Sequence, residues 1–254
     1  MQKSRFAFGS ALGLTLALAM TAAPGAGLAR TPEKPTAETT ITAAEREEFR
    51  AGVRQSGETM SLLMDAYPDE YVALETKVIL GVKTGQLDLA AVRQMSFEWA
   101  SNLRARVMAN ASKASDADLV AIGRRQKEIM LKLSSSNARA CYEFMEQGGL
   151  SQDSAAALGA ESRTEIDKLG AMQLRAASAA TKAPVVRQEV TEAEVRPILE
   201  DFQKNGGDIQ WLAAVGNPKE MANFSAEDRC TNARHWLDTI LDQPAPLSAR
   251  LLAG

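Results

Sequence analysis

A hydroxyl side chain stands three residues ahead of a carboxylate at the start of several apolar stripes in this chain. The pairs are Thr42 with Glu45, Ser115 with Asp118, Thr191 with Glu194, and Ser225 with Asp228. At this spacing the two side chains can satisfy the free backbone amides of the first helical turn. Each pair therefore predicts the start of an α-helix.

The stripes themselves repeat with a helical period. Apolar residues recur every three or four positions and charged residues fall on the opposite side. Residues that lose little side-chain freedom in a helix, such as Ala, Leu, Glu, Gln and Arg, are abundant. Alternation of apolar and polar residues is not sustained anywhere. We therefore predict an all-α fold, a helical bundle of about seven to nine amphipathic helices.

Proline and glycine residues mark the expected ends of these helices. The expected spans are 42–67, 69–84, 88–111, 115–147 with a kink or break at 134–137, 151–181, 191–205, 208–215, a last long helix from 225, and a final turn at 247–252. Residues 182–190, with Pro184, form a non-helical connector. The sequence therefore predicts one all-α domain over 42–254, with a possible sub-boundary near 182–190.

The first 29 residues have the order of a cleavable secretion signal. Lys3 and Arg5 precede an uncharged stretch that ends near Ala23, and small residues precede a cut after Ala29. A retained membrane anchor is the alternative, since an uncharged run of about 18 residues is barely long enough to span a bilayer. Its Gly and Ala content favours cleavage. We therefore expect a periplasmic or secreted protein, with residues 30–41 as a flexible linker.

The mature chain would carry 27 basic and 32 acidic residues, a net charge of −5. Both signs are interspersed, whereas nucleic-acid binding requires concentrated positive charge. A further apolar stretch of spanning length is absent from the sequence. We therefore expect no nucleic-acid partner and no membrane span in the mature chain.

Cys141 and Cys230 are the only cysteines, and 89 positions separate them. This spacing rules out a C-x-x-C redox motif and a cysteine-rich zinc site. Both cysteines lie on apolar sides of their predicted helices. In an oxidising compartment this placement predicts a disulfide between Cys141 and Cys230, with two free buried thiols as the alternative.

The sequence offers few residues for catalysis or metal binding. His235 is the sole histidine and lies away from the apolar side of its helix, as expected of a partly exposed bystander. We predict no catalytic residue, no metal site and no cofactor. Trp99, Trp211 and Trp236 are expected to be core anchors, and one of them could instead line a ligand groove.

One segment resembles a known enzyme family. Glu161-Ser162, followed by Gly170-Ala171-Met172-Gln173-Leu174, resembles the lysozyme-like lytic transglycosylases, in which a Glu-Ser pair supplies the general acid. The gap between the Glu-Ser pair and the Gly-Ala segment is shorter here than in that family. A serine and a glycine of the family pattern are missing, and the tyrosine-rich substrate segments of the family have no counterpart in this chain. No catalytic role is therefore carried over to Glu161.

These observations favour a non-enzymatic, exported helical protein of the cell envelope that binds an envelope protein or a ligand. The alternative hypothesis is a carboxylate-dependent hydrolase or lyase of cell-wall glycan. An acid buried in a cleft with a raised pKa would favour that enzyme, whereas an exposed apolar groove would favour binding.

Overall fold

The computed structural model describes residues 40–146 and 150–254, and over these ranges it is helical without strands. The predicted all-α fold class is therefore confirmed, although the helices slightly outnumber the seven to nine expected. The predicted signal at 1–29 and nearly all of the predicted linker lie outside the described residues. No helix of the described part is both long and apolar enough to cross a membrane.

The chain divides into two compact units, whose described parts are residues 40–104 and 105–254. The boundary falls inside α4 (Leu89–Met108). The connector at 182–190, where the sequence suggested a possible sub-boundary, lies inside the C-terminal unit.

The N-terminal unit contains α1 (Ala43–Gln55), α2 (Glu58–Ala66), α3 (Pro68–Lys83) and most of α4. The single helix expected over 42–67 is two helices, because Gly57 adopts a φ of 149° between them. That backbone conformation is open to glycine and strained for other residues. Pro68 then occupies the first position of α3, where its missing amide costs nothing.

The core of the N-terminal unit combines an aromatic cluster with a buried carboxylate. Tyr71 stacks on Phe49 and meets Trp99 edge-on, with ring centroids about 6 Å apart in both pairs. Glu75, one turn along α3, is completely buried. Its carboxylate accepts hydrogen bonds from the guanidinium groups of Arg46 and Arg50 on α1. Two positive charges therefore compensate the one buried acid.

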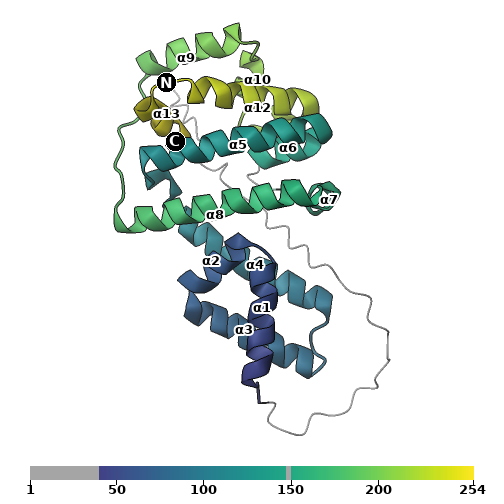
Figure 1. Ribbon diagram of the computed structural model, residues 1–254. Helices are drawn as coiled ribbons and strands as arrows, with labels where there is room; N and C mark the ends of the chain where they lie inside the picture. The colour runs from purple at the N-terminus through teal and green to yellow at the C-terminus, as the bar shows by residue number, and fades with distance from the viewer. Residues whose placement is uncertain (1–39, 147–149) are drawn as a thin grey trace. The chain divides into compact units, whose positions relative to one another are not determined.

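The C-terminal unit is built around α5 and α12. Its elements are the 3₁₀-helix η1 (Ala111–Lys113), α5 (Asp116–Ser136), α6 (Ala138–Glu146), α7 (Gln152–Ala157), α8 (Ala160–Lys182), α9 (Glu192–Lys204), α10 (Ile209–Ala214), α11 (Pro218–Met221), α12 (Ala226–Leu241) and α13 (Ala245–Ala253). α5 lies between α8 on one side and α12 and α13 on the other, and α9 packs on α12 (Figure 1). The helix expected over 151–181 is broken at Leu158-Gly159 into α7 and α8.

The end of α9 is fixed by a close approach between Gly207 and Phe202. Gly206 has a φ of 88°, and the amide of Gly207 donates to the carbonyl of Phe202 at 2.9 Å. The Phe202 ring packs against Trp211 and Trp236. A Cβ atom at position 207 would lie 2.3 Å from that ring.

The substitution Gly207→Ala should therefore destabilise the C-terminal unit by about 1–3 kcal/mol, because the buried ring must move to admit the new methyl group. Urea unfolding of the purified protein measures this change. Gly52→Ala is the control, since a Cβ there meets nothing within 4 Å and alanine favours the interior of α1. Equal stability of Gly207→Ala and wild type would contradict the prediction.

Two of the capping carboxylates also form ion pairs. Glu45 accepts from Lys83, and Glu194 accepts from Arg250, while each also caps its own helix through a threonine. The hydrogen bond from Lys83 and those from Thr42 lower the pKa of Glu45 from 4.5 to about 2. The hydrogen bond from Arg250 and those from Thr191 lower the pKa of Glu194 by the same amount.

A carboxylate with a lowered pKa stabilises the fold above its unfolded pKa and loses that effect as pH falls through its folded pKa. The stability difference between wild type and Glu194→Gln should therefore be present at pH 7, shrink below about pH 4.5, and vanish near pH 2. Thermal melts across this range measure it. Glu192→Gln is the control, because Glu192 is exposed and meets Arg196 only at 3.5 Å. A difference that persists at pH 2 would contradict the prediction.

Candidate functional site

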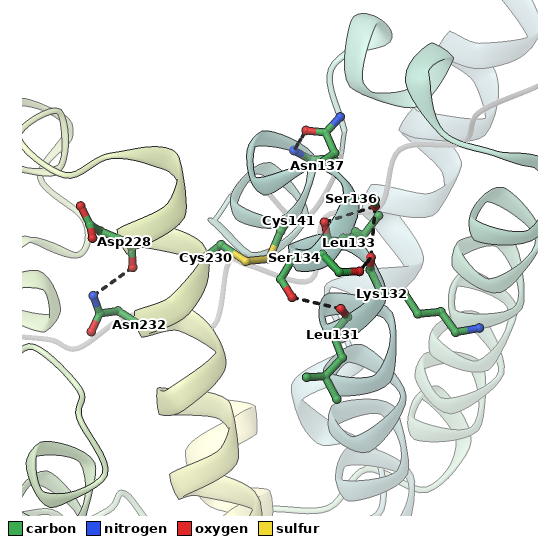
Figure 2. The surroundings of a disulfide bond; sticks show 12 residues. Leu131, Lys132, Leu133, Ser134, Ser136, Asn137, Cys141, Asp228, Cys230 and Asn232 are labelled. Atoms are coloured by element: carbon green, nitrogen blue, oxygen red, sulfur yellow. Dashed lines mark hydrogen bonds between the residues drawn. A yellow bond between two sulfur atoms is a disulfide. The ribbon is translucent and has the colours of Figure 1, made fainter.

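The two cysteines expected to pair do stand at bonding distance. Cys141 on α6 and Cys230 on α12 have sulfur atoms 1.99 Å apart and Cα atoms 5.5 Å apart. Both side chains are buried in the core of the C-terminal unit. Figure 2 shows the disulfide crossing directly between the two helices. It joins segments that lie on opposite sides of the 183–191 connector in the sequence.

The cross-link lies beside the last turn of α5 (Figure 2). Ser134 and Ser136 donate from their hydroxyl groups to carbonyls of the preceding turn, at 3.0 and 3.1 Å. Asn137 then caps α6 by accepting from the amide of Ala140 at 3.0 Å. The sequence placed a kink or a new cap at 134–137, and the structure has the new cap.

A buried carboxylate, Glu143, follows Cys141 on α6. It accepts from Arg139 at 2.8 Å and from the backbone amide of Ser151 at 2.9 Å. Burial raises the pKa of Glu143, but these hydrogen bonds outweigh burial and hold its pKa below the ordinary value. Glu143 is therefore an ionised carboxylate that accepts hydrogen bonds within the fold. A general acid would need a raised pKa instead.

The acid singled out by the enzyme resemblance lies on the surface. Glu161, in the first turn of α8, has a side chain that is 80% exposed and pairs with Lys132 at 2.8 Å. The hydrogen bond from Lys132 lowers the pKa of Glu161. An exposed acid with a lowered pKa is poorly suited to protonate a glycosidic oxygen.

His235 is half-buried on α12, near the turn that ends α9. Its ring lies within 4 Å of the position that a Cβ of Gly206 would occupy. Its Nδ1 atom is buried and has no hydrogen-bond partner among the described residues. The expectation of a partly exposed side chain is met.

The three tryptophans differ in their burial. Trp211 and Trp236 lie in the core of the C-terminal unit, where both contact Phe202, whereas Trp99 is half-buried in the N-terminal unit. Over residues 40–146 and 150–254, no group of three or more His, Cys, Asp or Glu side chains is placed to hold a metal ion.

A surface hollow lies between α5 and α8 in the C-terminal unit. It has a volume of about 280 Å³, just below the range typical of ligand sites. Asp118 and Arg175 supply an acidic and a basic group. The rest of its lining is apolar and consists of Ala121, Ile122, Met172, Ala176 and Ala179. Such a lining suits a small molecule or a protein side chain that carries both a charged and an apolar part.

Sequence reasoning missed this hollow and several buried ionic groups, among them Glu75, Glu143 and Arg187. Glu75 occupies a position on the apolar stripe of α3, between Tyr71 and Val78, and an acid on such a stripe was a usable signal. Arg187 in the connector is also nearly buried. The hollow had no sequence signal, because residues of two helices form it.

Comparison of the chain with protein-family models, with curated proteins and with solved structures finds no match.

Proposed function

We propose that this protein is exported to the cell envelope and acts there by binding a protein or a ligand through the hollow between α5 and α8. Export is supported by the signal-like order of residues 1–29 and by the cysteine pair, since such a bond persists in an oxidising compartment. Binding rests on one observation, an otherwise apolar hollow whose lining includes Asp118 and Arg175.

The export proposal is tested on protein isolated from the native envelope. N-terminal sequencing should find Arg30 as the first residue, and mass spectrometry without reduction should find no alkylatable thiol. A protein that retains residues 1–29, or that yields two free thiols, would overturn this part of the proposal.

Filling the hollow tests the binding proposal. Ala179→Trp places a large ring in the hollow from an exposed position of α8. Ser178→Trp is the control, because it places the same ring on the preceding residue, which is exposed but does not line the hollow. After crosslinking in the native envelope, wild type and Ser178→Trp should capture the same partner or ligand and Ala179→Trp should lose it. Equal capture by all three would overturn the role of the hollow.

The enzymatic alternative is separated from binding by an assay on peptidoglycan. Activity of wild type that is lost in Glu161→Gln would favour the carboxylate-dependent hydrolase or lyase over the binding proposal. The exposure and lowered pKa of Glu161 lead us to expect no such activity.

A further inference from the structure

The connector between α8 and α9, residues 183–191, is an extended segment on the surface of the C-terminal unit (Figure 1). Its side chains alternate as they do in a strand, because Val185 and Arg187 are partly buried while Val186 and Gln188 are exposed. Val186 is 94% exposed, more than any other large apolar side chain of the described residues.

Anchors on either side of Val186 hold it outward. The amide of Val185 donates to the carbonyl of Lys113 at 2.9 Å. The guanidinium of Arg187 donates to the carbonyl of Ser112 at 2.8 Å, to the carbonyl of Ala114, and to Asp116 at 2.6 Å. The side chain of Arg187 is only 10% exposed. The backbone between these anchors is therefore presented in an extended form.

Extended backbone with an outward side chain is the form that endopeptidases bind. These enzymes take one side chain of an extended substrate into a specificity pocket, and the elastase type has a small pocket. Other exposed apolar residues, such as Val72, Val82 and Leu131, lie on helices, where the backbone is already hydrogen-bonded. Val186 is free of that constraint, because it lies in neither a helix nor a strand.

We propose that the Val186–Arg187 peptide bond is a proteolytic processing site for an endopeptidase whose pocket accepts a small aliphatic side chain. Water supplies the hydroxyl that joins the Val186 carbonyl carbon, and the C–N bond breaks. The products are a carboxylate on Val186 and an ammonium group on Arg187. This inference does not depend on the proposed binding role.

Cleavage here would leave the protein in one piece. Cys141 precedes the cut and Cys230 follows it, so the disulfide joins the two fragments. In addition, α12 from the second fragment packs against α5 and α6 from the first. The expected product is a folded, two-chain protein whose chains separate only when the disulfide is reduced and the fold is lost.

Limited digestion of the mature protein, residues 30–254, with pancreatic elastase tests the site. The first cut should yield fragments that end at Val186 and begin at Arg187, seen by mass spectrometry only after reduction. Val186→Lys should slow this cut by roughly tenfold or more, because a small pocket rejects a long charged side chain. Gln188→Lys is the matched control and should be cut at the same bond.

A first cut within residues 42–254 but outside 183–191, or equal rates for wild type and Val186→Lys, would overturn the proposal, whereas cuts in the predicted linker at 30–41 do not bear on it. Protein isolated from the native envelope gives the second test. Two chains on a reducing gel and one on a non-reducing gel support processing, and a single chain under both conditions contradicts it.

Discussion

Replacing both cysteines with alanine is expected to lower the free energy of unfolding of the C-terminal unit by roughly 4–5 kcal/mol. The bond closes a loop of 89 residues, and cross-linking a loop of that length removes a corresponding amount of chain entropy from the unfolded state. Loss of the bond therefore favours unfolding even though α6 and α12 keep their other contacts. Urea unfolding of the double variant Cys141→Ala/Cys230→Ala measures the change.

A reducing agent supplies the control for this prediction. Added during unfolding, it should move the urea midpoint of wild type close to that of the double variant, and it should leave the variant unchanged. A wild-type midpoint that does not respond to reduction under unfolding conditions would show that the bond contributes little.

Removal of the buried carboxylate of Glu75 should destabilise the N-terminal unit by about 3 kcal/mol. Breaking a buried ion pair usually costs 3–5 kcal/mol, because the remaining charge loses its partner. Here the two arginines are about one-third exposed and retain some hydration, so the lower end of that range applies. Unfolding of Glu75→Ala, followed by circular dichroism, measures the loss.

Two further variants test whether the stability lost in Glu75→Ala arises from the buried charges. Lys83→Ala removes the surface pair with Glu45 and the hydrogen bond from Lys83 to the carbonyl of Thr40, and should cost much less than Glu75→Ala. The triple variant Glu75→Leu/Arg46→Met/Arg50→Met removes the charges together and should recover much of the stability that Glu75→Ala loses. If the triple variant is less stable than Glu75→Ala, the ionic explanation is wrong.

The sequence predicted helix starts well because the determinants of a start are local. Thr42, Ser115, Thr191 and Ser225 each cap a helix as expected, since a hydroxyl and the amide three residues later are brought together by the helix itself. The disulfide could also be predicted from the sequence, because two cysteines allow only one intramolecular bond.

The features that the sequence did not reveal depend on contacts between distant segments. Arg187 reaches acceptors more than 70 positions away, and nothing in residues 182–190 indicates where they lie. The hollow between α5 and α8 likewise depends on how two helices pack. The breaks near Gly57 and Gly159 were missed because the apolar stripes continue across them.

The disulfide also sets an order of events during synthesis. Cys141 is made 89 residues before Cys230, so its thiol stays unpaired for about 4 to 18 seconds at typical elongation rates. No other cysteine in the chain can pair with it wrongly in that time. Since α12 brings the second thiol, oxidation is completed only after nearly the whole chain has been made. Bond formation therefore reports that the chain has been made at least as far as the start of α12.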